Sequence, residues 1–199
     1  MTNLPLHPPV AVFRCPQYDC KQIQSLLVQA FEQLQLNPRN LFYGKKVLLK
    51  PNIVHASSPD QAVCTHPAVV EAAALLVQEA GGQPLMAESP GGPYTKALLQ
   101  RVCQVSGLAD AARRAGMTIN SDFSSVPFSA PDGTEVREFE ILRPIAEAEV
   151  ILNLSKMKTH TLAGISCASK NLFGAIPGVQ KFGLHARFRD QKRFLAALN

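Results

Sequence analysis

The chain has 199 residues, 46% of them hydrophobic, with a net charge of +5 and a near-neutral mean hydropathy. These values are typical of a soluble globular protein, so we expect one domain over residues 1–199, located in the cytoplasm. No apolar run approaches the roughly 20 residues of a membrane span and no secretory signal opens the chain. Dispersed basic residues, 7% aromatic residues and the absence of Trp argue against a nucleic-acid partner.

Apolar patterns in the first half of the chain predict strands and helices in turn. Residues 10–14 and 47–50 fit strands, and residues 20–36 have apolar side chains at helical spacing. A second helix over 67–80 is expected to begin at a cap formed by Thr65 or His66 and to end at two glycines. The polar loop that precedes this helix is long enough to be functional.

The second half of the chain continues the alternation. We expect a strand at 85–88, helices at 95–104 and 108–115, a short strand at 118–120, one helical turn at 144–148 and a strand at 150–154. A period-two pattern around Pro131-Asp132-Gly133-Thr134 predicts an antiparallel hairpin. The order of elements predicts an α/β fold, a mostly parallel, Rossmann-like sheet flanked by helices, with the hairpin as an insertion.

A basic segment stands directly behind the predicted strand at 150–154. It contains Lys156, Lys158 and His160. Residues that leave the carboxyl end of a central parallel strand point into the crevice where open α/β sheets bind ligands. Two ammonium groups and an imidazole at this place indicate a small anionic ligand such as a phosphate or a carboxylate.

Three further polar clusters follow predicted strands or lie in a Gly/Pro-rich stretch. Ammonium groups suit an anion, and the two glycines allow a ligand to approach the backbone closely. Asparagines at such places also commonly fix loops, and a glutamate can pair with a lysine. The candidate ligand-binding residues over all clusters are Lys50, Asn52, Glu88, Ser89, Gly91, Gly92, Lys156, Lys158, Lys170, Asn171 and Lys181.

Histidines are the candidate catalytic residues. His160 could act as a general base because nearby lysines would keep its imidazole neutral, and His66 and His185 are its candidate companions. We expect His160 within reach of Lys170 or of another histidine. The spacing of the histidines contains no HxH or HxxxH pair, so we predict no metal site. The five cysteines contain no CxxC pair, and we expect them to be reduced.

The ordered motifs also carry a resemblance to a known family. The segments LLKPN at 48–52, THP at 65–67, ESPGG at 88–92, LNLSKMKTH at 152–160 and SKNLFGAIPG at 169–178, followed by Lys181 and His185, resemble the uncharacterised DUF362 family. Members often carry a ferredoxin-like iron-sulfur module after this domain. The resemblance implies that a ferredoxin-like domain or protein could be a partner. It also implies that the chain, which stops at Asn199, is a fragment or lacks the C-terminal part of the fold.

Two classes of function therefore stay open. The first is an enzyme that binds a small anionic substrate and moves a proton with His160, while lysines neutralise the developing charge. The second is a non-catalytic or redox-accessory module in which the same lysines hold an anionic cofactor or partner. The sequence names neither the ligand nor a cofactor.

Overall fold

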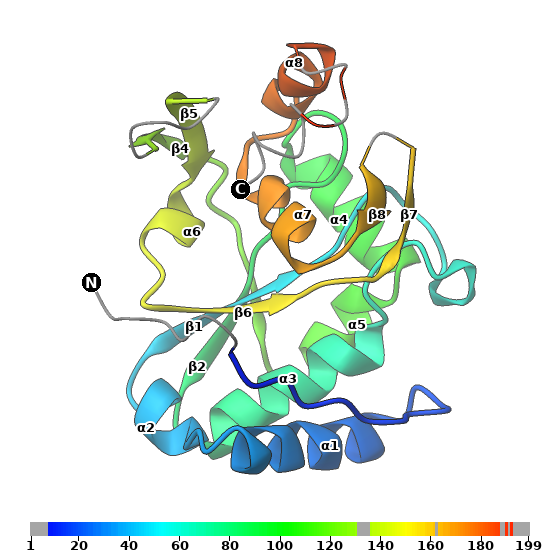
Figure 1. The fold of residues 1–199 in the computed structure, drawn as a ribbon, viewed down its shortest axis with the longest axis vertical. Coiled ribbons are helices and arrows are strands. Elements are labelled where there is room, and N and C mark those ends of the chain that lie inside the picture. Colours follow the sequence, from blue (N-terminus) through cyan, green and yellow to red (C-terminus); the bar gives the residue numbers. More distant parts are fainter. Residues whose placement is uncertain (1–7, 131–135, 162, 188–189, 191, 193–199) are drawn as a thin grey trace.

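The computed structural model describes residues 8–130, 136–161, 163–187, 190 and 192 (Figure 1). Helices and strands alternate through most of this part. In chain order the elements are α1 (Cys20–Gln33), α2 (Pro38–Phe42), β1 (Lys46–Pro51), η1 (Pro59–Gln61), α3 (Pro67–Glu79), β2 (Gln83–Met86), α4 (Lys96–Val105), α5 (Leu108–Arg114), β3 (Thr118–Ile119), β4 (Ser125–Ser129), β5 (Glu138–Leu142), α6 (Arg143–Ala146), β6 (Val150–Leu154), β7 (Lys158–His160), β8 (Gly164–Ser166), α7 (Ala168–Leu172), η2 (Phe173–Ala175) and α8 (Gln180–Arg187).

A four-stranded parallel sheet with the order β3-β2-β1-β6 forms the centre of the fold. In β1, every residue after Lys46 is buried, as expected for a central parallel strand covered on both faces. Two antiparallel pairs, β4-β5 and β7-β8, stand beside this sheet. The predicted α/β class, with helices around a parallel sheet and an antiparallel insertion, is confirmed.

Alternate residues of β1 contribute to cores on opposite faces of the sheet. Val47 and Leu49 belong to the larger core, which they share with α3, α4 and α5. Leu48 belongs to a smaller core with Leu142 and Ile145. In Figure 1, α1 and α3 lie on one side of the sheet, and α6 and α7 lie on the other. The sheet is therefore the middle layer, and the carboxyl ends of its strands remain available at one edge.

Capping residues explain where two of the predicted helices begin. His66 caps α3, where its Nδ1 accepts a hydrogen bond from the Ala68 N–H at 3.2 Å, and Pro67 occupies the first turn. Thr95 caps α4 through its hydroxyl, which accepts from the Leu98 N–H at 3.3 Å. The helix predicted at 67–80 ends as expected, because Gly81 adopts a φ of 83° that side chains disfavour.

The strand predicted at 10–14 is wrong. These residues pair with no strand of the described structure, and Val10 and Val12 are 80% and 85% exposed. The alternating valines fit the spacing of a strand, but that spacing carries no information about a pairing partner. Elements absent from the prediction include the short helix α2, which Asn37 caps, the β7-β8 pair and α7.

The predicted hairpin insertion is confirmed in its two strands. Residues Ser125 to Ser129 pair antiparallel with Leu142 to Glu138. The turn predicted at Pro131-Asp132-Gly133-Thr134 lies outside the described residues. Within the part of the chain that the structure describes, no helix is long and apolar enough to cross a membrane.

The segment after β8 is anchored on the strand ends of the parallel sheet. The Lys50 ammonium donates to the Asn171 carbonyl, and the Ser89 hydroxyl accepts from the Gly178 N–H at 2.8 Å. Gly174 lies so close to the Glu88 carboxylate that a Cβ atom at this position would stand 1.9 Å from Glu88 Oε1. Only a glycine therefore fits between the late segment and the buried carboxylate.

Replacing Gly174 with Ala should destabilise the fold. The methyl group would push Glu88 away from its position in the buried ion pair, at a cost of about 1–3 kcal/mol, as for other overpacked sites. The matched control is Gly183→Ala in α8, where nothing stands within 4 Å of the added Cβ and where Ala stabilises a helix by about 0.5–1 kcal/mol. Urea unfolding followed by circular dichroism measures both. Equal midpoints for the two variants would contradict the close packing of Gly174 on Glu88.

Candidate functional site

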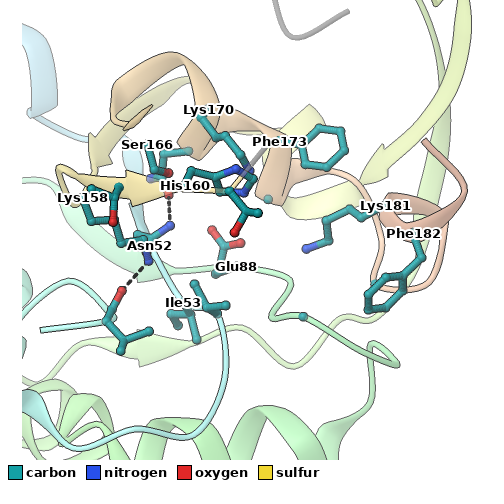
Figure 2. A pocket seen from close by; sticks show the side chains of 18 residues that line it. Asn52, Ile53, Glu88, Lys158, His160, Ser166, Lys170, Phe173, Lys181 and Phe182 are labelled. Carbon is teal, nitrogen blue, oxygen red and sulfur yellow. Dashed lines mark hydrogen bonds between the residues drawn. The ribbon is translucent and has the colours of Figure 1, made fainter. Parts of the chain in front are cut away.

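A pocket of about 640 Å³ opens at the carboxyl edge of the parallel sheet (Figure 2). Its walls come from the loops after β1 and β2, from the β7-β8 pair, and from α7, η2 and α8. Eight of the residues predicted from the sequence line it: Asn52, Glu88, Gly91, Lys158, His160, Lys170, Asn171 and Lys181. The structure thus brings together polar side chains that are far apart in the sequence.

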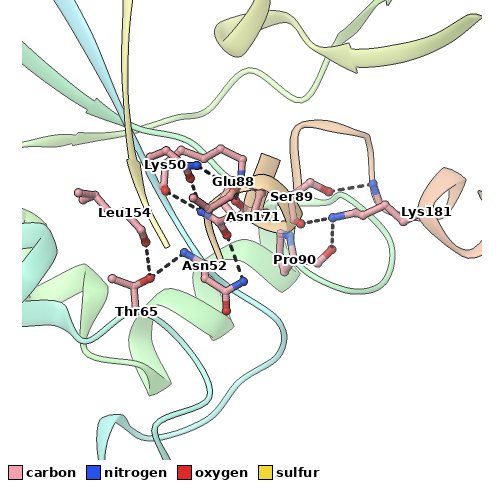
Figure 3. Close-up of polar contacts among 12 residues, drawn as sticks. Lys50, Asn52, Thr65, Glu88, Ser89, Pro90, Leu154, Asn171 and Lys181 are labelled. Carbon is pink, nitrogen blue, oxygen red and sulfur yellow. Dashed lines mark hydrogen bonds and ion pairs between the residues drawn. The ribbon is translucent and has the colours of Figure 1, made fainter. Parts of the chain in front are cut away.

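A buried ion pair lies behind this pocket. Lys50 is fully buried in β1, and its ammonium contacts the carboxylate of Glu88, which follows β2 and is 3% exposed. The same ammonium donates to the Asn171 carbonyl of α7 (Figure 3). Lys50 does not line the pocket, but its charge contributes to lowering the pKa of the lining residues Lys170 and Lys181.

Glu88 presents its carboxyl group to the pocket from an environment that disfavours charge. Burial raises the pKa of Glu88 above its ordinary value, and the Lys50 and Lys181 ammonium groups oppose this effect. A buried carboxyl group with a raised pKa can hold a proton close to neutral pH and can donate it. Burial and the two ammonium groups thus act on the carboxyl group of Glu88 in opposite directions.

Lys181 reaches into the pocket from α8. Its ammonium donates to the Ser89 carbonyl and, at 3.4 Å, to the Pro90 carbonyl, as Figure 3 shows. Burial lowers the pKa of Lys181 to about 8, while the Glu88 carboxylate acts in the opposite direction. A lysine with this pKa changes its charge within the range of pH in which proteins work.

Lys158 and Lys170 supply two more amines to the same pocket. Lys158, in β7, donates to Asn52 Oδ1 at 2.7 Å and to the Val63 carbonyl. Burial lowers the pKa of both lysines, and their mutual proximity contributes to the lowering for Lys170. The Lys170 ammonium also lies 5.3 Å from the ring centroid of Phe173. The lysines are thus held in place on the wall of a partly desolvated cavity.

His160 lies on the same face of β7 as Lys158, because residues two apart in a strand point in one direction. Its Nδ1 accepts a hydrogen bond from the Ala163 N–H at 3.0 Å. In a neutral imidazole that accepts at Nδ1, the proton is carried by Nε2. The Nδ1 atom of His160 is thus hydrogen-bonded within the protein. Its predicted contact with Lys170 stays a prediction, although both residues line the pocket.

Three asparagines fix the strand ends beneath the pocket. The Asn171 amide donates to the Lys50 carbonyl at 3.1 Å and to Asn153 Oδ1 at 2.7 Å. Asn171 Oδ1 accepts from the Asn52 amide at 3.1 Å. These contacts connect β1, β6 and α7, so they hold the framework of the site and leave ligand contacts to the lysines.

Several predicted residues lie away from the pocket. Lys156 donates to the Tyr18 hydroxyl at 2.9 Å, and Tyr18 stacks on His66 with ring centroids 3.9 Å apart. Burial, followed by the Lys156 charge, lowers the pKa of His66. The structure therefore does not bring Lys156 or His66 to His160. Ser89 and Gly92 lie behind the pocket wall against Gly178.

The side chain of His185 lies outside the described residues, although its backbone belongs to α8. Among the residues that the structure describes, no group of three or more His, Cys, Asp or Glu side chains could hold a metal ion. Cys103 is buried, which raises the pKa of its thiol to about 12. This thiol is therefore poorly suited to act as a nucleophile.

Gly174, Phe173 and Phe182 are among the lining residues that the sequence did not single out. Gly174 was seen only as part of a Gly/Pro-rich stretch, and nothing in the sequence pairs it with Glu88. Phe173 and Phe182 supply apolar surface to the pocket. The sequence signal for Phe182 is an aromatic residue directly after Lys181, and in the structure its side chain is 59% exposed.

Comparisons with known proteins place the chain in a family. Residues 47–199 match the family described as "Domain of unknown function (DUF362)". Thylakoid-associated protein sll1697 of Synechocystis sp. is 30% identical over 190 residues, which is 93% of this chain and 56% of that protein. The chain thus spans little more than half the length of this relative. No solved structure matches the chain.

The family match covers the segments from LLKPN to SKNLFGAIPG, on which the resemblance rested. It also covers all the elements that line the pocket. The resemblance is therefore confirmed, and the chain belongs to the DUF362 family.

Proposed function

We propose that the pocket binds a small anionic ligand that carries a phosphate or carboxylate group. The observation that carries this proposal is the meeting of Lys158, Lys170 and Lys181 in one cavity. Glu88 is the carboxylate among the described lining residues, and it also contacts Lys50. Cations therefore outnumber anions around the cavity, as expected for an anion site.

The desolvation of the lysines supports the same proposal. Burial is the first cause that lowers the pKa of all three lysines, so each ammonium group loses solvation in the pocket. An anion that enters the pocket offers these groups charge-assisted hydrogen bonds in place of water. Such bonds would offset part of the desolvation that lowers the pKa of these lysines.

In this proposal Glu88, and not His160, is the group that transfers a proton. His160 lines the pocket, but its Nδ1 already accepts from the Ala163 N–H, so that nitrogen is not available as the base. Glu88 would exchange the proton, because burial raises its pKa and it lines the cavity. A binding module without catalysis would use the same lysines, so the affinity for anions is the first quantity to measure.

The location and the protein partner of the chain stay predictions from the sequence. A cytoplasmic location and a ferredoxin-like partner are part of this proposal, and both rest on the family resemblance and the composition. The printed name of the relative associates that protein with thylakoids. Fractionation of cells that express the whole protein would test the location.

Replacing Lys170 with Gln should weaken anion binding, whereas Lys156→Gln should not. Both changes remove one positive charge, but Lys170 lines the pocket and Lys156 contacts Tyr18 outside it. Loss of a hydrogen bond to a charged group costs about 1.5–3 kcal/mol, which corresponds to roughly a tenfold to hundredfold lower affinity. Titration calorimetry with sulfate and with oxalate measures both variants. An equal loss in the two would mean that the net charge, and not the pocket, attracts anions.

The affinity for sulfate should fall as pH rises through about 8. Lys181, whose pKa is lowered to about 8, is protonated below this pH and loses its charge above it. Sulfate keeps its charge over this range, so the pH dependence reports the protein.

Calorimetry at several pH values between 7 and 9 measures this fall, which should be several-fold in the unmodified chain. The Lys181→Met variant should bind sulfate more weakly at pH 7 and with a flatter pH profile. An identical profile in the variant would show that Lys181 does not contribute to the site.

A further inference from the structure

We propose that the pocket takes an aromatic anion, a ligand whose phosphate or carboxylate group is attached to a planar ring, and that Phe182 contacts this ring. This inference rests on the proposed function, because the charged group of such a ligand would occupy the anion site. It adds a class of ligand to that site and names a residue that selects this class.

The pocket is larger than a simple anion requires. Its volume of about 640 Å³ lies within the range of about 300–1,000 Å³ that is typical of sites for organic ligands. A phosphate or carboxylate group fills only a small part of this space. The remaining volume is available to a further group of the ligand, and the side chains that surround it indicate the chemistry of that group.

Apolar side chains line the pocket together with the lysines. They come from the loop after β1 and from the segment after β8, and they are Ile53, Val54, Val63, Phe173 and Phe182. Val54 and Phe182 are also exposed to solvent. Contact between such side chains and an apolar group removes apolar surface of both from water, which favours binding. The further group of the ligand should therefore be apolar.

The charged and aromatic side chains occupy different sides of the pocket. In Figure 2, Asn52 and Lys158 lie on one side, and Phe173 and Phe182 lie on the other. The hydrogen bond from Lys158 to Asn52 Oδ1, at 2.7 Å, belongs to the polar side. A ligand that fills the pocket would thus carry a charged group at one end and an apolar group at the other.

The aromatic side favours a ring over an aliphatic group. A ligand ring can stack on Phe182 or meet its edge, which adds to the effect of the buried area. The face of a ring also attracts an ammonium group, and the pocket contains one such contact, with Lys170 Nζ 5.3 Å from the ring centroid of Phe173. Figure 2 shows the Lys181 side chain on the same side as Phe182. An aliphatic group of equal size would gain only from its burial.

Backbone contacts hold the apolar wall in place. The Val54 carbonyl accepts from the Gly91 N–H at 2.8 Å, and a Cβ at Gly91 would stand 2.9 Å from the same oxygen. The Val63 carbonyl accepts from the Lys158 ammonium. Phe182 follows Lys181, whose ammonium donates to the backbone after β2. The wall is therefore formed before a ligand binds, as is usual for small-molecule sites.

Three phosphate esters that share one charged group test the class of ligand. Titration calorimetry on the full chain compares methyl, cyclohexyl and phenyl phosphate at a pH at which all three are dianions. Phenyl phosphate should bind at least about tenfold more tightly than methyl phosphate, because its ring is buried. It should bind roughly threefold more tightly than cyclohexyl phosphate, because of the ring contacts. Equal affinities of the phenyl and cyclohexyl esters would overturn the aromatic class.

Replacing Phe182 with Ala tests the residue. The affinity for phenyl phosphate should fall close to that for methyl phosphate, and the affinity for methyl phosphate should not change. Phe182 is 59% exposed, so the variant should keep its fold, which circular dichroism checks. The matched control is Tyr43→Ala, which removes a ring that is 61% exposed at the end of α2, outside the pocket. Unchanged binding of phenyl phosphate in Phe182→Ala would overturn the role of this side chain.

The same measurements separate this inference from the proposed function. Lys170→Gln should weaken the binding of the methyl and phenyl esters by a similar factor, since it acts on the charged group that both contain. A loss confined to phenyl phosphate in this variant would overturn the division of the pocket. Equal binding of methyl and phenyl phosphate by the unmodified chain would overturn the aromatic ligand and leave the anion site standing. Absence of binding by all three esters would overturn the proposed function itself.

Discussion

The buried contact between Lys50 and Glu88 is the constraint on which the site depends. An ammonium group in a fully buried central strand is costly unless a partner and further hydrogen bonds compensate it. Glu88 supplies the partner from the neighbouring strand, and the Asn171 carbonyl supplies the next acceptor from α7. The hydrogen bonds of the Lys50 ammonium therefore require the end of β2 and helix α7 to lie against the end of β1. The floor of the pocket follows from this requirement.

The same convergence determines the electrostatics of the pocket. Once Glu88 is held against Lys50 and covered by Gly174, α8 brings Lys181 close enough to act on the pKa of Glu88. Segments that lie late in the chain cover the strand ends and exclude water from the amines of Lys158 and Lys181. Their lowered pKa values result from this burial, so the fold and the chemical character of the site have one origin.

The sequence predicted the edge of the sheet correctly, but not which side chains turn inward. Parallel strands with polar ends implied that the groups after β1, β2 and β6 would meet, and the alternation of elements was sufficient for that. Lys156 and Lys158 are two residues apart, yet only Lys158 lines the pocket. The difference depends on where β7 begins and on Tyr18, which attracts Lys156. Such long-range contacts, like that of Gly174 with Glu88, leave no periodic signal in a sequence.

Glu88 and Lys181 are best regarded as one titrating unit. Each affects the pKa of the other, and burial penalises the charged form of both. An anion that binds in the pocket would favour the charged amine of Lys181 and so oppose the effect of burial on its pKa. The same anion would disfavour the charged form of Glu88, so binding would act on the two groups together.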